Sequence, residues 1–195
     1  MDERNKLDTL EKRMDRIIEW VKTCDTKASI LLSINAFVFT VLLASDFMMN
    51  GIKSVIVSVY NPEYTEASIS GTIAVAAFAL AVISLLASML YCIWVLKAKT
   101  SENQTKKQGV KIDSLIHFHH ISQLSSFAEF QTQMDSETDE VYKHDLYSQI
   151  FINAVRCQEK FDDYNTAVNW LIGAIPFALS YLIFIVFFLA QTPTV

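Results

Sequence analysis

The sequence predicts an all-α membrane protein with three transmembrane helices, two of them continuous with cytoplasmic stalk helices, plus a small cytoplasmic helical module. Three long apolar runs carry this prediction: Ala28–Met49, Ile69–Leu96 and Val168–Ala190. None of them contains Lys or Arg, and Asp46 is the only acidic residue among them. A helix needs about 20 apolar residues to cross the hydrocarbon of a bilayer, and each run is that long.

The distribution of positive charge predicts the orientation of these spans. Segment 1–27 holds seven Lys and Arg residues and segment 97–167 holds eight, whereas loop 50–68 holds only Lys53 and tail 191–195 holds none. Positively charged residues near transmembrane helices stay on the cytoplasmic side. We therefore expect a multi-pass protein with its N-terminus and central block in the cytoplasm, and with the loop and the C-terminus outside.

Composition excludes several classes of protein. The chain is 52% hydrophobic with a net charge of −5, so it lacks the basic character of a nucleic-acid-binding protein. Its first 27 residues are charged throughout, which does not fit a signal peptide. Cys24, Cys92 and Cys157 have no close spacing, and we expect them to be small, reduced packing residues rather than a disulfide framework.

The first stalk is predicted as a helix that runs into the first span without Pro or Gly. Apolar residues recur along it at alternating intervals of three and four, the spacing of a heptad stripe. The members of this stripe are Leu7, Leu10, Met14, Ile17, Val21, Cys24 and Ala28.

The second stalk is predicted to start near residue 137, with Ser136 as N-cap, and to continue into the third span, where Pro176 should kink it. The two stalk stripes are expected to pack against each other within one chain or to form an oligomer seam. The second stripe consists of Tyr147, Ile150, Ala154, Cys157, Phe161, Tyr164, Val168 and Leu171.

The segment between the second and third spans reads as three parts. Residues 100–111 are polar and are expected to form a linker, residues 112–121 a strand or extended segment, and residues 123–134 a short amphipathic helix. Loop 50–68 is expected at the outer interface, with a turn at the NPEY sequence of residues 61–64.

Polar and small residues within the spans predict helix contacts. Asn35 should form an interhelical hydrogen bond, with a pore-lining role as the alternative. The small-xxx-small pairs of the second span, Ala77–Ala81 and Ser84–Ser88, favour close helix packing. The bulky aromatic residues of the third span suit lipid contact, and they are Phe177, Tyr181, Phe184, Phe187 and Phe188.

Few residues of the chain are candidates for a ligand-binding, metal or catalytic site. Asp25 and Lys27 stand where the first span begins, and they either anchor the interface, bind a ligand or lock the stalks through Lys160 or Asp163. The histidines His117, His119 and His120 have no second cluster of ligands, so no metal site is expected. There is no Gly-rich phosphate loop, nucleophile elbow or paired-carboxylate motif, so we expect no catalysis.

Three short motifs resemble the Pycsar effector transmembrane (PycTM) family. In Trp20–Asn35 an aromatic residue is followed by an Asp-x-Lys-Ala step and a Leu-rich span, as at the start of that family's spans. Asp145–Tyr164 resembles the region ahead of its last span. Phe118-His-His-Ile121 takes the place of the family's Phe-x-x-Ile step, although His119 and His120 stand where the family often has Gly. The resemblance covers roughly residues 17–190.

The resemblance implies a membrane effector of bacterial anti-phage defence. A partner nucleotide cyclase makes a cyclic nucleotide on infection, and this activating ligand causes the effector to impair the inner membrane and arrest growth. The ligand implied is a cyclic pyrimidine mononucleotide, with cyclic oligonucleotides left open because related membrane effectors use them. No cofactor and no nucleic acid are implied, and the partners are the lipid bilayer, the cyclase and further copies of the chain.

The resemblance also implies candidate residues for ligand binding or stalk coupling. An anionic ligand would in addition suit a cationic or imidazole side chain, with an aromatic residue such as Trp20 stacking on its base. Two alternatives to a nucleotide-activated effector remain. One is an anchor or scaffold that recruits a cytoplasmic partner through residues 97–167, and the other is an oligomeric channel without a ligand. The candidates are Asp25, Lys27, Asp145, Gln149 and Lys160 from the motifs, and His119, His120, Arg156 and Tyr164 from their chemistry.

Overall fold

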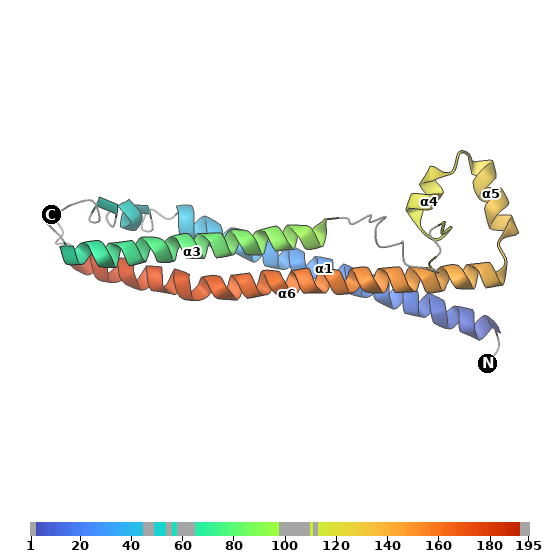
Figure 1. The fold of residues 1–195 in the computed structure, drawn as a ribbon, viewed down its shortest axis with the longest axis horizontal. Helices are drawn as coiled ribbons and strands as arrows, with labels where there is room; N and C mark the ends of the chain where they lie inside the picture. The colour runs from blue at the N-terminus through green and yellow to red at the C-terminus, as the bar shows by residue number, and fades with distance from the viewer. Residues whose placement is uncertain are drawn as a thin grey trace. The chain divides into compact units, whose positions relative to one another are not determined.

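The computed structural model of the protein describes residues 3–44, 49–53, 56–57, 65–97, 110 and 113–191. These residues contain helices and no strand, so the all-α prediction is confirmed for this part of the chain. Apart from residue 110, the predicted linker lies outside the described residues, as does the predicted turn at 61–64. The main helices are α1 (Glu3–Ala44), α3 (Thr65–Leu96), α4 (Phe118–Gln123), α5 (Phe127–Ser136) and α6 (Asp139–Gln191) (Figure 1).

Three of these helices, α1, α3 and α6, are long and apolar enough to cross a membrane, which confirms the three predicted spans. α1 has 42 residues and α6 has 53, and each is one continuous helix as expected. At about 1.5 Å per residue they measure about 63 and 80 Å, against about 30 Å of bilayer hydrocarbon. Each therefore has a long portion outside the apolar layer. α6 continues through Pro176, and the kink there remains a prediction.

The start of α6 differs from the predicted N-cap. Ser136 is the last residue of α5, where its hydroxyl donates to the carbonyl of Gln133 at 2.9 Å. The hydroxyl of Thr138 instead accepts from the N–H of Val141 at 3.4 Å, and α6 begins at Asp139. The N-cap prediction for Ser136 is wrong because α5 extends two residues beyond the expected end of the amphipathic helix.

The segment expected to be extended is helical from Phe118 onward, so that prediction is wrong for residues 118–121. The reason is a local cap that apolar patterning does not reveal. His117 precedes α4 with an extended backbone, and its ring nitrogen Nδ1 accepts from the N–H of His119 at 3.3 Å. This bond satisfies one of the free donors at the start of a helix.

The expected amphipathic helix is present as α5 and begins four residues later than predicted. Ser126 accepts from the N–H of Glu129 at 3.2 Å, and the carboxylate of Glu129 accepts from the N–H of Ser125 at 2.8 Å. This reciprocal arrangement resembles a capping box and fixes the first turn. The hydrogen bonds from Ser125 also lower the pKa of Glu129.

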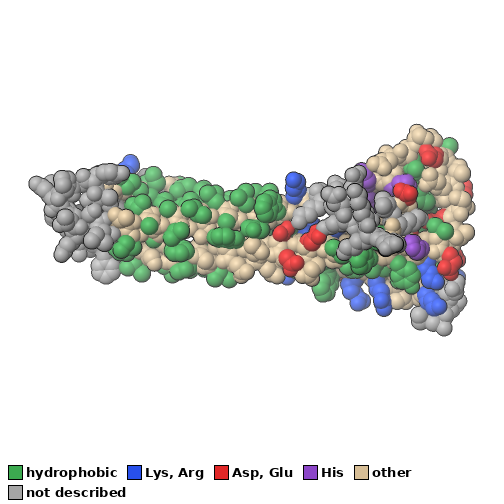
Figure 2. All heavy atoms as spheres, viewed as in Figure 1, with side chains coloured by type: hydrophobic (Ala, Val, Ile, Leu, Met, Phe, Trp, Pro, Cys, Tyr) green, Lys and Arg blue, Asp and Glu red, His purple; other side chains and the backbone are tan. Residues whose placement is uncertain are grey.

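The chain divides into two compact units. We call residues Met1–Asp25 with Lys97–Phe161 the stalk unit, and residues Thr26–Leu96 with Asp162–Val195 the membrane unit. α1 and α6 contribute residues to both. Figure 2 shows hydrophobic side chains along the membrane unit and charged side chains gathered over the stalk unit.

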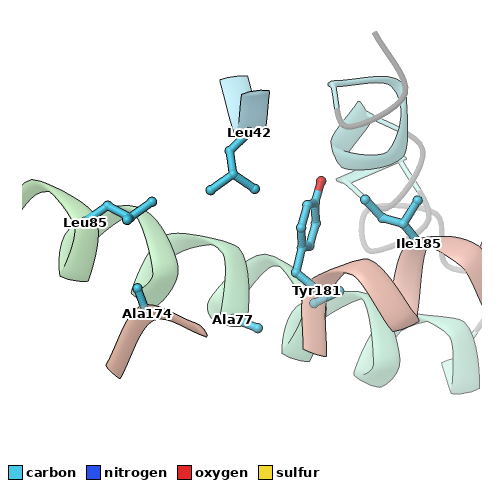
Figure 3. Packing of buried hydrophobic residues seen from close by; sticks show 7 residues of the cluster. Leu42, Ala77, Leu85, Ala174, Tyr181 and Ile185 are labelled. Carbon is cyan, nitrogen blue, oxygen red and sulfur yellow. The ribbon is translucent and has the colours of Figure 1, made fainter. Parts of the chain in front are cut away.

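The core of the membrane unit joins α1, α3 and α6 (Figure 3). The small residues of α3 are buried where the other two helices approach it, which confirms the packing predicted from their spacing. They include Ala74, Ala77, Ala81, Ser84 and Ser88.

Tyr181 corrects the prediction that the aromatic residues of the third span contact lipid. Its side chain is 1% exposed, and its ring centroid lies 4.8 Å from that of Phe78. Figure 3 shows the ring standing between Leu42 and Ile185. The small residues of α3 leave room for this large ring in the core. The exposed face of α6 carries aliphatic side chains instead: Ile172, Ile175, Leu179, Ile183 and Val186. The side chains of Phe187 and Phe188 lie outside the described residues.

Enlarging a buried small residue of α3 should destabilise the membrane unit. Ala77→Leu would force a larger side chain into the core, and we expect a loss of about 1–3 kcal/mol in the free energy of unfolding. Ala79→Leu is the matched control, because Ala79 is exposed. Thermal unfolding in detergent micelles measures both, and equal midpoints for the two variants would contradict the packing described.

Candidate functional site

Polar contacts join α1 to α6 inside the stalk unit. They occur in the same order along both helices, so the two segments run in the same direction. Burial and the hydrogen bond to Glu11 raise the pKa of Tyr142 to about 12, which keeps its phenol protonated as a donor. The contacts are Tyr142 Oη to Glu11 Oε1 at 2.9 Å, Asn153 Nδ2 to Met14 Sδ at 3.8 Å, and Lys160 Nζ to Asp25 Oδ1.

The Asp25–Lys160 pair is one of the contacts that the sequence offered as an alternative. The Lys160 side chain is 13% exposed and that of Asp25 is 38% exposed, so the pair is only partly screened by solvent. Removing either partner would leave the other charge in a partly buried place, which is costly. The pair therefore joins α1 to α6 at this point of the stalk unit. Lys27, the other motif residue here, is exposed and belongs to the membrane unit.

The face of α6 that packs in the stalk unit lies one residue ahead of the predicted apolar stripe. Each member of the predicted α1 stripe is buried or half-buried, but Tyr147 is 52% exposed and Ala154 is also exposed. The α6 prediction is wrong at these two positions because it counted apolar residues only. The packed face includes polar residues, and its heptad members are Leu146, Gln149, Asn153, Arg156 and Lys160.

Motif residues Asp145 and Gln149 lie on this packed side of α6, with 0% and 3% exposure. His117 lies close enough for the charges of Asp145 and Arg156 to act on its ring. Burial is the largest cause that lowers the pKa of His117, followed by the positive charges of Arg156 and His119, while Asp145 opposes them. The interior of the stalk unit is therefore polar, and it favours a neutral His117.

Arg156 is half-buried beside this cluster. Burial lowers its pKa and Glu159 opposes that change. Its Nε atom is buried without a hydrogen-bond partner in the described part of the chain. A guanidinium in this state can still donate to an acceptor that approaches it.

The remaining candidates are spread over other places. His119 is exposed on α4, and His120 Nδ1 lies 4.0 Å from Asp113 Oδ1. Tyr164 packs in the membrane unit against a cluster around Leu31. Among the residues that the structure describes, no three His, Cys, Asp or Glu side chains gather as metal ligands.

A groove of about 420 Å³ lies between α1 and α6 on the stalk unit. Its walls are mainly apolar, and Trp20 in it is 59% exposed. The sequence pointed to Trp20 as a stacking residue but not to Arg16 or Gln158. Residues four apart share one face of a helix, as Arg16 does with Trp20 and Gln158 with Ala154. This spacing was the signal in the sequence that could have identified them. The lining residues are Arg16, Ile17, Trp20, Ala154, Cys157, Gln158 and Phe161.

Asn35 links all three helices of the membrane unit. It is 0% exposed, and its Nδ2 donates to Ser88 Oγ at 2.8 Å. The hydroxyl of Ser88 in turn donates to the carbonyl of Ala167 at 2.8 Å. This confirms the predicted interhelical hydrogen bond, and it places Asn35 inside the helix contact rather than on an open surface of the chain. The three cysteines are buried and form no disulfide, as expected of packing residues.

Comparison with known proteins gives one family. The model of the Pycsar effector protein domain, PycTM, matches residues 9–189. The Pycsar effector protein GmPycTM of Gulbenkiania mobilis is 27% identical over 189 residues, which cover 89% of this chain and 93% of that protein. No solved structure matches the chain.

The hydrogen bond between Asn35 and Ser88 should be measurable as a coupling energy. In a double-mutant cycle of Asn35→Ala and Ser88→Ala, we expect a coupling of about 0.6–1.7 kcal/mol, the range for hydrogen bonds between membrane helices. Ser33→Ala is the control, because the hydroxyl of Ser33 donates to Ser29 on its own helix. Reversible unfolding in mixed micelles gives the energies, and additive effects of the two substitutions would refute the link.

Acidification should loosen α4 through His117. The pKa of His117 in the folded chain lies below the ordinary value of 6.5. Between these two pKa values the unfolded segment binds more protons than the folded one, so the stability of the fold rises with pH. The contribution of His117 to stability is therefore present above pH 6.5 and is lost as the pH falls below it. Protonation also removes the Nδ1 acceptor at the cap. In His117→Asn, which keeps a capping acceptor, the pH dependence should shrink.

Amide hydrogen exchange of α4 between about pH 7.5 and 5.5, corrected for intrinsic rates, measures this effect. His144→Asn removes an exposed histidine of α6 and should leave the pH dependence unchanged. The same pH dependence in the wild-type chain and in His117→Asn would show that other groups cause it.

Proposed function

The chain belongs to the Pycsar effector family, and from that premise we propose that it is a non-enzymatic membrane effector of a cyclic-nucleotide anti-phage defence system. A partner cyclase supplies the nucleotide on infection, and the effector responds by impairing the bacterial inner membrane, which arrests growth. The observation that carries the proposal is the extent of the family match, which covers both the stalk unit and all three spans.

The stalk unit is the part that senses the nucleotide. It holds the polar and cationic side chains that an anionic ligand requires, whereas the core of the membrane unit is apolar apart from Asn35, Ser84 and Ser88. The Lys and Arg distribution favours a cytoplasmic N-terminus and an outward C-terminus, so a nucleotide made in the cytoplasm would reach this unit.

The two long helices couple the ligand to the membrane. α1 and α6 each supply residues to both units without a break, so a change in their packing in the stalk unit acts on two of the three spans. A ligand shifts such an equilibrium only by its difference in affinity for the two arrangements. A nearly complete switch needs a difference of about 10⁴-fold, or about 5.5 kcal/mol.

Impairment of the membrane involves several copies of the chain. In one copy the contact between the spans is filled by Leu42, Leu85, Tyr181 and Ile185, and Asn35 is enclosed. A closed three-helix core offers no aqueous path, so a homo-oligomer that rearranges on activation is the form that we propose. This burial also disfavours a constitutive channel lined by Asn35.

A second candidate is an anchor that recruits a cytoplasmic protein through the stalk unit. Large apolar side chains are exposed around α4 and α5, with Phe118 at 70%, Phe127 at 78% and Met134 at 44%. Such side chains are typical of protein interaction sites. This candidate predicts a stable stoichiometric partner and no effect of nucleotides.

Leakage from vesicles tests the proposal. The full-length chain is reconstituted in dye-loaded vesicles, and cyclic uridine, cytidine, adenosine and guanosine monophosphates and cyclic dinucleotides are added one at a time. We expect dye release with one pyrimidine mononucleotide and none with the purine controls. Silence with every nucleotide, in vesicles that contain folded protein, would refute the effector and favour the anchor.

A further inference from the structure

We propose that the groove between α1 and α6 of the stalk unit is the binding site of the activating nucleotide, with the base between Trp20 and Phe161 and the cyclic phosphate at Arg16. This inference rests on the proposed function and adds the location of its ligand and the residues that recognise it.

The size of the groove favours a single nucleotide. Its volume of about 420 Å³ is near the lower end of the range of small-molecule sites, about 300–1,000 Å³. A cyclic oligonucleotide carries two or more bases and phosphates, and it would extend well beyond these walls. The groove therefore suits a cyclic mononucleotide.

The aromatic side chains that line the groove suit the base of the nucleotide. Trp20 comes from α1 and Phe161 from α6, so two aromatic side chains on different helices line one groove. An indole that is 59% exposed leaves a large apolar ring in water, which a stacked base would cover. Bases stack on aromatic side chains through their faces. The amide of Gln158 offers both a donor and an acceptor to the polar edge of the base.

The positive charge of Arg16 suits the cyclic phosphate of the nucleotide. Arg16 lies one turn before Trp20 and is exposed, and within the described ranges no carboxylate lies at ion-pairing distance from it. A cyclic phosphate diester carries one negative charge, and a guanidinium forms charge-assisted hydrogen bonds with phosphate oxygens. This is the charge complementarity that distinguishes the site from a purely apolar groove, which would suit a second copy of the chain.

None of the candidate residues from the motifs lines the groove, so they do not compete for this role. Asp145 and Gln149 are buried on the packed side of α6, and Lys160 binds Asp25. Lys160 nevertheless follows groove residues Cys157 and Gln158 by three and two positions. A nucleotide that draws α1 and α6 together at the groove would therefore act on the adjacent ion pair.

Binding to variants of the full-length chain in detergent micelles tests the site. Equilibrium dialysis with labelled cyclic uridine and cyclic cytidine monophosphate gives the affinities. We expect Trp20→Ala and Arg16→Ala each to weaken binding at least tenfold, and Trp20→Phe to retain most of it. Arg13→Ala is the matched control, because it removes the same charge from an exposed position of α1 outside the groove. Its affinity should equal that of the wild-type chain.

The outcomes distinguish an error in the proposed site from an error in the proposed function. If the wild-type chain binds a cyclic nucleotide and the groove variants bind it equally well, the site is wrong and the proposed function stands. If the wild-type chain, shown to be folded, binds none of them, the proposed function fails as well. If Trp20→Ala changes the oligomeric state but not the nucleotide affinity, a second copy occupies the groove and the inference is overturned.

Discussion

The unbroken length of α1 and α6 is the constraint on which the rest of the structure depends. Within a bilayer every backbone N–H and C=O must be satisfied by its own helix, so an apolar segment cannot stop or turn there. Both helices are far longer than the hydrocarbon layer requires, with their charged halves in the stalk unit and their apolar halves in the membrane unit. A ligand that binds between α1 and α6 in the stalk unit would therefore be bound by the same helices that form two of the spans.

The two units use different contacts between those helices. In the membrane unit small residues of α3 allow close approach, and one polar chain through Asn35 and Ser88 holds three helices together. In the stalk unit the packed face of α6 carries Asp145, Gln149 and Arg156. Buried polar groups add little net stability even when they are hydrogen-bonded, and they cost free energy otherwise. In the proposed function, the stalk contact is therefore the one that a ligand would rearrange.

The sequence predicted the spans and the α1 stripe because long apolar runs and heptads of apolar residues leave few alternatives. It was wrong on α6 at Tyr147 and Ala154, because the packed face there includes polar residues and a count of apolar positions selects the neighbouring stripe. It also assigned Tyr181 to lipid, since composition alone does not show that α3 leaves space for a ring. The cap of α4 was missed because His117 serves as an acceptor there, a role more often filled by Ser, Thr, Asp or Asn.

These errors bear on how the family's motif residues act. Asp25, Asp145, Gln149 and Lys160 were candidates for ligand binding or for stalk coupling. Asp145 and Gln149 are buried, and the other two form an ion pair between helices. Residues in such places determine which arrangement of α1 and α6 is stable. The residues that we propose to contact the nucleotide line the groove between the same helices, at Arg16, Trp20 and Gln158. If the proposed site is right, the motif residues define the contact between α1 and α6, while neighbouring and less distinctive positions recognise the nucleotide.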